Sequence, residues 1–420
     1  MNAAEAIPDQ PVGGSERVVA LDFIRGIAVL GILFANIVAL AQPTLAYYWP
    51  KGLPGGATDV DRYVWLFQFV LIDGKFRGLF TLLFGAGMIL FHERVAARGA
   101  GLSLQPRRLF WLALFGLAHT FLVWTGDILL LFAVSGFAAL AMLGWQARTQ
   151  LRFGVVWFLS GSLLFCILLG SQAAMEGIPR LQEQRPDAYE QVRRGVAEQV
   201  EEAAEEAAVM RDGSYGEVVA YRVADEGPGL PPQLIFVALI ETLPLMLIGM
   251  GLYRLGLFER RLDHARIRRW GWIGVLGGAA LSLPLGLWVL VAGFPLWLTQ
   301  FVFNAAAAFL HLPMILGLAA LLSLWAPTAS VTWLGSRVTA AGRMAFSNYL
   351  GTSLVMMLLF QGWAGGLYGE FHRAGLLLFV ILGMALMLAW SKPWLARFRY
   401  GPLEWLWRCL TYGKRLPLRR

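Results

Sequence analysis

The sequence predicts an all-α, polytopic integral membrane protein in which about ten transmembrane helices form one bundle. Three observations predict this class. Hydrophobic residues make up 58% of the chain and charged residues only 15%, whereas soluble domains carry about 25% charged residues. Long apolar runs recur along the chain, and acidic residues gather in a single segment. We therefore expect a membrane bundle with one helical, extracytoplasmic insert.

Ten apolar runs are long enough to cross a bilayer, which takes about 20 helical residues. They are residues 22–42, 74–92, 108–125, 127–146, 152–172, 233–253, 270–292, 297–325, 343–364 and 373–391. Arginines gather in the connections after the second, fourth, sixth and eighth runs and in the tail. Because cytoplasmic connections carry an excess of basic residues, we expect both termini to be cytoplasmic.

The acidic segment, residues 173–232, holds 13 acidic and 6 basic side chains, although the whole chain has a net charge of +8. Its alanine and glutamate run predicts a helix. The segment is interpreted either as a solvated cap or as a lid that recruits substrate. It separates an N-terminal membrane half (1–172) from a C-terminal membrane half (233–392), which is followed by an amphipathic tail (393–420).

The first apolar run, "LDFIRGIAVLGILFAN", carries three polar residues, Asp22, Arg25 and Asn36. At about 100° per residue all three share one helix face. Asp22 and Arg25 are spaced for an ion pair, and Asn36 is placed to bond a neighbouring helix. Ionisable residues at membrane depth are costly and mark sites of function. The stripe therefore predicts either internal packing or a polar path through the bundle.

The motif "IDGKFRGLFTLLFGAG" places Asp73 where it could cap a helix whose first turns hold Lys75 and Arg77. The two cations either reach the outer headgroups or form a clamp for a phosphate, a carboxylate or a thioester oxygen. Gly85 and Gly87 leave one side of this helix thin, which predicts a close helix contact.

The stretch "GLAHTFLVWTGDILL" contains His119 near the outer end of the third run and Asp127 at the start of the fourth. Asp127 is explained by capping of the new helix. A buried histidine beside a carboxylate is also the arrangement of a general base. His311 lies two residues before Pro313, which is expected to kink the helix and free a backbone carbonyl. The first interpretation of His311 is a hydrogen bond to that carbonyl, and the second is a catalytic role.

The segment "AAGRMAFSNYLGTSLV" places Arg343, Ser347 and Asn348 at the cytoplasmic mouth, where they could meet a nucleotide phosphate. A simple cation at the membrane surface is the alternative for Arg343. In the tail, "GPLEWLWRCLTYGK" spaces Glu404 and Arg408 four residues apart, as in an interfacial amphipathic helix.

The chain resembles the YeiB-like family of bacterial inner-membrane proteins, a family of unknown function. The resemblance rests on five motifs in order: "LDFIRGIAVLGILFAN", "DGKFRGLFTLLFGAG", "GLAHTFLVWTGDIL", "GRMAFSNYL" and "GPLEWLWRCLTYG". Together they run from about residue 17 to residue 414.

That family is placed in a wider superfamily of transmembrane acyltransferases, which take an acyl group from cytoplasmic acyl-CoA to an acceptor on the far side. The resemblance implies an inner-membrane enzyme that transfers an acyl group, with acetyl as first choice, to a glycan or a lipid. It also implies that Asp22, Arg25 and Asn36 line the path of the acyl-CoA donor. Independently of the resemblance, Arg343 and Asn348 are further candidates for binding the donor. Lys75 and Arg77 would contact the substrate.

The lysosomal member that acetylates heparan sulfate glucosamine carries its catalytic histidine in the loop after the counterpart of Asn36. Here that loop has Tyr47 and Tyr48 instead. We expect His119 with Asp127 to take the catalytic role, and His311 is the second candidate.

A membrane transporter or lipid carrier, with the same polar stripe lining its path, is the alternative function. A noncatalytic scaffold is the third. We expect membrane lipids as partners, leave a homo-oligomer open, and expect neither a nucleic-acid partner nor a metal. The two cysteines, Cys166 and Cys409, predict no disulfide.

Overall fold

The computed structural model describes residues 18–97 and 103–420, and in these ranges the chain is built of helices. They are α1 (Val19–Ala41), α2 (Thr44–Tyr48), α3 (Asp59–Leu71), α4 (Lys75–Ala97), α5 (Leu104–Leu122), α6 (Leu129–Ala139), α7 (Ala147–Gly177), α8 (Pro179–Gln184), α9 (Pro186–Asp212), α10 (Tyr215–Tyr221), α11 (Leu230–Val237), α12 (Leu243–Arg254), α13 (His264–Val291), α14 (Leu296–Gln300), α15 (Ala308–Ala329), α16 (Trp333–Arg343), α17 (Ala345–Phe360), α18 (Arg373–Arg397) and α19 (Pro402–Tyr412). Two predicted boundaries move, because α7 runs beyond residue 172 and α18 runs beyond residue 392.

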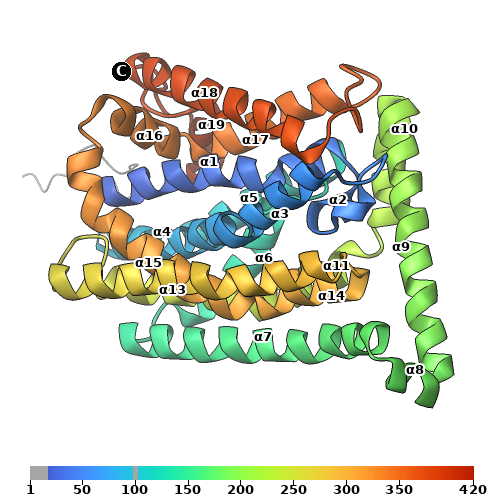
Figure 1. Cartoon of the computed structure of the whole chain (residues 1–420). Helices are drawn as coiled ribbons and strands as arrows, with labels where there is room; N and C mark the ends of the chain where they lie inside the picture. Colours follow the sequence, from blue (N-terminus) through green and yellow to red (C-terminus); the bar gives the residue numbers. More distant parts are fainter. Residues whose placement is uncertain (1–17, 98–102) are drawn as a thin grey trace, which may run out of the picture.

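The long helices lie side by side along one direction, and α9 crosses their ends (Figure 1). The start of α1 and the C-terminus lie at the opposite end of the bundle from α9 (Figure 1). We call these two ends the termini end and the insert end.

Seven segments of the described chain are long and apolar enough to cross a membrane. They are Val19–Ala41, Asp59–Ala97, Ala147–Gly177, Leu230–Arg254, His264–Val291, Leu296–Ala329 and Arg373–Arg397. The predicted runs 127–146 and 343–364 form shorter apolar helices, and the run 108–125 forms α5, which does not meet both criteria. Length and composition thus indicate a helical membrane protein with seven of the ten predicted crossings.

Burial separates the inner helices from the outer ones. The apolar stretch of α1 is 67% buried within the protein and that of Leu230–Arg254 is 61% buried, whereas those of α7 and α13 are each only 22% buried. In a membrane protein, such exposed apolar helix faces meet lipid. α1 and α12 therefore form the centre of the bundle, and α7 and α13 lie at its edge.

Glycines bring α4 and α12 into direct backbone contact. A Cβ atom on Gly249 of α12 would lie 1.9 Å from the carbonyl oxygen of Leu82, and one on Gly85 of α4 would lie 2.1 Å from that of Met246. The predicted close contact of this helix is therefore confirmed at Gly85. Small residues allow such approach between membrane helices.

Gly249→Ala is expected to lower the melting temperature of the purified protein. Overpacking typically costs about 1 to 3 kcal/mol, and here the added methyl group meets a backbone atom that cannot rotate away. Gly277→Ala in α13 is the matched control, because no heavy atom lies within 4 Å of a Cβ placed there. An unchanged melting temperature in Gly249→Ala would contradict the backbone contact.

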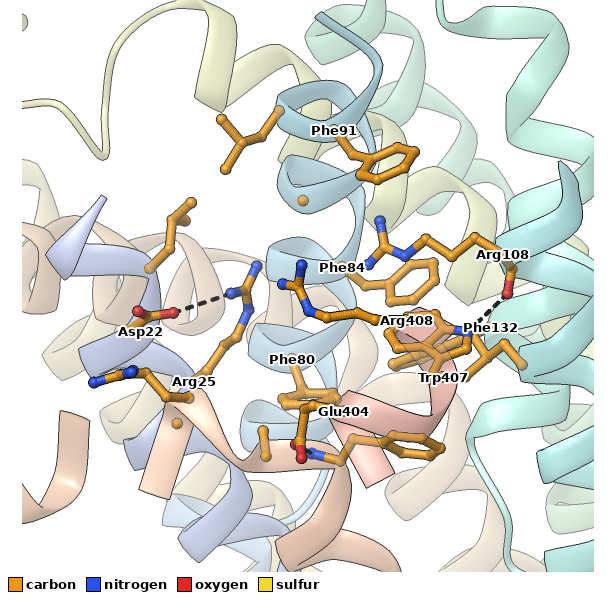
Figure 2. Close-up of a pocket in the computed structure, with 18 of the residues that line it drawn as sticks. Asp22, Arg25, Phe80, Phe84, Phe91, Arg108, Phe132, Glu404, Trp407 and Arg408 are labelled. Carbon is orange, nitrogen blue, oxygen red and sulfur yellow. Dashed lines mark hydrogen bonds and ion pairs between the residues drawn. The ribbon is translucent and has the colours of Figure 1, made fainter. Parts of the chain in front are cut away.

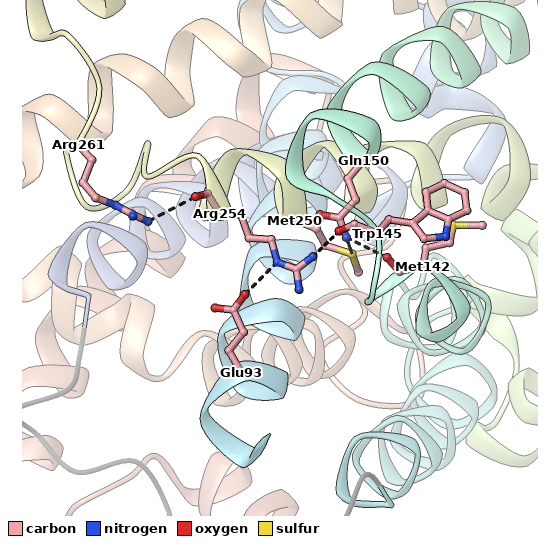
Figure 3. A network of polar contacts seen from close by, with 7 residues as sticks. All are labelled: Glu93, Met142, Trp145, Gln150, Met250, Arg254 and Arg261. Atoms are coloured by element: carbon pink, nitrogen blue, oxygen red, sulfur yellow. Dashed lines mark hydrogen bonds and ion pairs between the residues drawn. The ribbon is translucent and has the colours of Figure 1, made fainter. Parts of the chain in front are cut away.

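A polar network closes the termini end around Arg254, the last residue of α12 (Figure 3). Its Nε donates to Glu93 of α4 at 2.9 Å, and its Nη1 donates to the carbonyl oxygen of Trp145 at 2.6 Å. Nearby, the Gln150 amide of α7 donates to the carbonyl oxygen of Met142 at 2.9 Å. The network ties α4, α12 and the α6–α7 connection together.

The acidic segment 173–232 is held against the insert end. Its alanine and glutamate run forms α9. The backbone N–H and the hydroxyl of Thr44, which follows α1, both donate to Glu206 of α9, at 2.9 and 3.0 Å. The N–H of Gly362, which follows α17, donates to the carbonyl oxygen of Met210 at 3.0 Å. These bonds dock α9 onto the connections that follow α1 and α17.

Candidate functional site

A cavity of about 250 Å³ lies at the termini end, between the start of α1, the end of α4, the start of α5 and the tail helix α19. Its charged lining consists of five arginines and two carboxyl groups: Arg25, Arg94, Arg108, Arg343, Arg408, Asp22 and Glu404. Its aromatic lining includes Phe80, Phe84, Phe91, Phe132, Phe346 and Trp407 (Figure 2). Positive charge with aromatic walls suits an anion that carries an apolar or aromatic part. We call this space the arginine cavity.

The predicted ion pair of α1 forms one wall of this cavity. The Arg25 guanidinium lies 3.3 Å from the Asp22 carboxylate, one helical turn away (Figure 2). A Cβ on Gly342 would lie 1.8 Å from the carbonyl oxygen of Asp22, and one on Gly87 would lie 3.0 Å from the Arg25 side chain. The absence of side chains at Gly342 and Gly87 therefore lets α16 and α4 approach the pair. The prediction that Asp22 and Arg25 pair is confirmed.

The opposite wall is built around Arg108 of α5. Its guanidinium lies 5.1 Å from the ring centre of Phe91 and 4.5 Å from that of Trp407. The Trp407 indole N–H donates to the carbonyl oxygen of Arg108 at 2.9 Å (Figure 2). Cation–π contacts on two rings hold the guanidinium in a defined position. Arg108 thus presents a fixed positive charge to the cavity.

Glu404 fastens the tail helix α19 to the bundle. Its carboxylate accepts from the N–H groups of Phe346 and Ser347, at 2.8 and 3.0 Å, and from the Ser347 hydroxyl at 2.5 Å. It therefore caps the N-terminus of α17. Burial raises the pKa of Glu404, and the hydrogen bonds from Ser347 oppose that shift. The sequence predicts Glu404 and Arg408 as an i, i+4 pair of an interfacial helix, whereas in the structure the Glu404 carboxylate accepts its hydrogen bonds from α17.

Glu404→Ala is expected to destabilise the protein by about 1.5 to 3 kcal/mol, because it removes a charged hydrogen-bond acceptor. Thermal melting would show the loss, and limited trypsin digestion would show faster cleavage of the tail. Glu198→Ala on the exposed face of α9 is the matched control. Equal melting and equal digestion of the two variants would contradict the fastening role of Glu404.

His119 and Asp127 touch, and both side chains are 1% exposed. The imidazole Nδ1 lies 2.8 Å from Asp127 Oδ1, and Asp127 Oδ2 accepts from the N–H of Leu130 at 2.7 Å. Asp127 therefore caps α6 and also contacts the histidine. This contact favours the tautomer with the proton on Nδ1. The buried Nε2 has no hydrogen-bond partner among the described residues, so it is available as a base.

Tyr349 connects this pair to the arginine cavity. Its ring centre lies 5.4 Å from that of His119, and its hydroxyl accepts from the N–H of Ile128 at 3.2 Å. Tyr349 lines the arginine cavity and also a separate void of about 10 Å³ that Asn36 lines. The polar residues of α1 therefore lie on both sides of Tyr349: Asp22 and Arg25 at the arginine cavity, and Asn36 at the small void.

His119 lies close to the insert end. The Tyr215 hydroxyl of α10 donates to the carbonyl oxygen of Leu122, one turn beyond His119, at 3.0 Å. Arg108 lies eleven residues before His119 on the same helix, a rise of about 16 Å. The histidine and the arginine cavity thus occupy different depths of the bundle.

Besides His119, Asp127 and Asn36, three more predicted site residues do not line the cavity. The Asn348 amide donates to the carbonyl oxygen of Ala341 at 3.0 Å and accepts from the Trp390 indole at 2.8 Å, so it joins α16, α17 and α18. Lys75 is fully buried, which excludes the headgroup explanation for it. Arg77 pairs with Glu241 at 2.8 Å.

Sequence reasoning did not single out Arg108, Trp407 or Tyr349 as site residues. Trp407 lies within the motif "GPLEWLWRCLTYG" and Tyr349 within "GRMAFSNYL". Tyr349 follows Asn348, so its side chain points about 100° away around the helix. Comparing the two helix faces would have been a way to find it from the sequence. The contact between Arg108 and Trp407 joins residues 299 positions apart and depends on the folded structure.

The chain is similar to uncharacterised bacterial proteins over nearly its whole length. A family model described as "Protein of unknown function (DUF418)" matches residues 252–414. The chain is 31% identical to "Uncharacterized protein YeiB" of Escherichia coli (strain K12), over 94% of this chain and 96% of that protein. It is 29% identical to "Uncharacterized protein YxaH" of Bacillus subtilis (strain 168), over 96% of each chain. No solved structure gives a significant match.

The match to the Escherichia coli protein covers nearly the whole length of both chains. From the identity and coverage of this match we conclude that the chain belongs to the YeiB-like family.

Proposed function

We propose that the protein is a transmembrane acyltransferase, which moves an acyl group from acyl-CoA to an acceptor hydroxyl or amine. One observation supports this most directly: the arginine cavity, Tyr349 and the His119–Asp127 pair follow one another through the bundle. Acyl-CoA has phosphates at one end and a reactive thioester at the other. It therefore requires an anion site at one depth of the bundle and a base at another.

The arginine cavity would hold the phosphate-bearing end of acyl-CoA. Arginine is the side chain best suited to bind phosphate through two parallel hydrogen bonds. At about 250 Å³ the cavity holds only part of such a donor. The thioester arm would extend along the α1 stripe toward Asn36. Since the void there is about 10 Å³, Tyr349 and its neighbours would move apart when the donor binds.

The chemistry assigned to the pair is general-base catalysis. Nε2 of His119 removes the proton from the acceptor, whose oxygen or nitrogen then attacks the thioester carbonyl carbon. The carbon–sulfur bond breaks, and the departing thiolate takes the proton from the imidazolium. Asp127 holds the ring orientation and stabilises the imidazolium.

The proposed topology has ten crossings of the bacterial inner membrane, with α5, α6 and α17 added to the seven apolar segments. Both termini would lie in the cytoplasm, as the arginines of the termini end favour. The insert end would then face an extracytoplasmic glycan or lipid acceptor. Donor binding from the cytoplasm and acceptor binding from outside follow from this orientation.

The test is thiol release from acetyl-CoA by the purified full-length protein in nanodiscs, with glycan and lipid acceptors supplied in turn. Release that depends on both acceptor and protein would support the proposal. If wild-type protein released no thiol with any donor–acceptor pair but carried substrate across a liposome membrane, the transporter or lipid-carrier alternative would replace it.

A further inference from the structure

A second group of buried charges lies at the break between α3 and α4, and Asp73, Lys75, His311 and Arg373 of this group do not line the arginine cavity. Gly74 makes this break, with a φ of +76°. A Cβ on Gly31, halfway along α1, would lie 2.1 Å from the Phe76 ring, which follows the break directly. The break is therefore at mid-depth in the bundle. Interrupted helices at this depth are typical of substrate and ion sites in membrane proteins.

Four polar side chains at the break are almost completely buried, with exposures of 2% for Asp73, 0% for Lys75, 1% for Arg373 and 0% for Gln68. The Arg373 guanidinium donates to Gln68 at 2.7 Å and to the carbonyl oxygens of Ala46 and Tyr47 at 2.6 and 2.8 Å. Arg373 is thus held by neutral acceptors.

Asp73 and Lys75 are not joined directly. The Lys75 ammonium donates to the carbonyl oxygen of Phe69. Neither oxygen of Asp73 accepts a hydrogen bond of ordinary geometry within the described residues, although Lys75, Arg373 and the Tyr47 hydroxyl lie close enough to act on its charge. The predicted cap of α4 by Asp73 therefore does not form.

His311 of α15 completes the group. A Cβ on Gly74 would lie 2.4 Å from its Nδ1, so the imidazole packs on the break itself. Its Nε2 is buried without a hydrogen-bond partner among the described residues. The predicted bond from His311 to a carbonyl freed by Pro313 is not formed. The ring therefore brings an unused proton-accepting nitrogen to the break.

Burial makes two unjoined opposite charges costly. If one proton moves from the Lys75 ammonium to the Asp73 carboxylate, both charges disappear and no atom is lost or gained. His311 offers a third position for the same proton. Moving the proton from Lys75 to Asp73 would therefore avoid the cost of two separate buried charges.

We propose that Asp73, Lys75 and His311 form a proton-exchange site at mid-depth in the bundle, where one proton is shared among a carboxylate, an amine and an imidazole. Such a site serves a proton-coupled step, and it does not depend on the acyltransferase function proposed above. Buried ionisable chains of this kind are used as proton relays in membrane proteins.

The charged and titratable groups around the site do not themselves exchange a proton with Asp73, Lys75 and His311. Arg77 of α4 is neutralised by Glu241, which lies in the π-helical segment Ala238–Thr242. Burial raises the pKa of Tyr47 of α2, so its hydroxyl stays protonated at neutral pH. Arg373 of α18 keeps its proton because a guanidinium is not deprotonated in proteins.

The test is infrared spectroscopy of the full-length protein in nanodiscs between about pH 5 and about pH 9, which covers the range where buried carboxyl groups titrate. The band of a protonated carboxyl group should change with pH in the wild type and be lost in Asp73→Asn. Lys75→Met and His311→Gln should each move the midpoint of that change by about one pH unit or more. His92→Gln, at the other end of α4, is the matched control and should leave it in place.

A carboxyl band that is absent or constant over this range would overturn the proposal, as would a midpoint that Lys75→Met leaves unchanged. Because a single buried charge can prevent folding, melting is measured first, together with the double variant Asp73→Asn with Lys75→Met. The double variant should melt above both single variants, since it leaves neither charge unpaired. If it melts no higher than they do, the two groups are not coupled and the proposal fails.

Discussion

His119→Ala is expected to lower acyl-CoA turnover by about 10²- to 10⁴-fold, the usual contribution of a general base. Asp127 lies 2.8 Å from Nδ1 of the His119 imidazole, and Nε2 has no hydrogen-bond partner among the described residues, so Nε2 can accept the proton. Asp127→Asn should fall between His119→Ala and the wild type, because an amide keeps the cap on α6 but removes the charge that stabilises imidazolium. Turnover is measured as thiol release per purified protein.

Binding of the donor should survive this substitution, because His119 lies outside the arginine cavity. Calorimetry with acetyl-CoA would therefore give the same dissociation constant for His119→Ala and the wild type. His264→Ala, at the start of α13, is the matched control and should keep full turnover. Full turnover in His119→Ala would remove this residue from the mechanism.

The double substitution Arg25→Gln with Arg108→Gln is expected to weaken acetyl-CoA binding by about 100-fold or more. A hydrogen bond to a charged group contributes about 1.5 to 3 kcal/mol, and every 1.4 kcal/mol corresponds to about tenfold in affinity. The two residues form opposite walls of the cavity. Arg62→Gln is the control, since its side chain is 47% exposed on α3 and pairs with Asp59.

A second ligand makes this test specific for the phosphates. An acyl thioester of pantetheine, which lacks the nucleotide, should bind the double variant and the wild type equally. If the double variant bound acetyl-CoA as tightly as the wild type did, the arginine cavity would not be the donor site. Added salt should weaken wild-type binding and affect the double variant less, because fewer charges take part.

Local features of the sequence predicted the parts of the site that depend on one helix. Asp22 and Arg25 are one turn apart, so their pairing follows from helix geometry alone. The same is true of the cap that Asp127 provides, which depends on a residue three positions later. Apolar runs predicted most helices for a similar reason, since a crossing requires a continuous apolar stretch.

Contacts between distant helices could not be predicted in the same way. The cavity combines α1, α4, α5 and α19, and nothing in the sequence states which helix ends meet. Asn348 and Tyr349 are adjacent, yet only the tyrosine faces the cavity, because the choice depends on the rotation of α17. For Lys75 the sequence left a headgroup position and an anion clamp open. Its burial depends on α15 and α18, which bring His311 and Arg373 to the break.

α19 contributes to the arginine cavity from a position in the chain that follows the seven apolar segments. α19 follows every apolar helix, so it leaves the ribosome after they have been made. Until α19 is made, the chain lacks Trp407, which forms a wall of the arginine cavity, and Glu404, which caps α17. A premature stop after α18 would leave the seven apolar segments intact and the proposed donor site incomplete. If the proposed donor site is correct, acyl-CoA binding would distinguish full-length molecules from truncated ones, a difference that membrane insertion alone would not reveal.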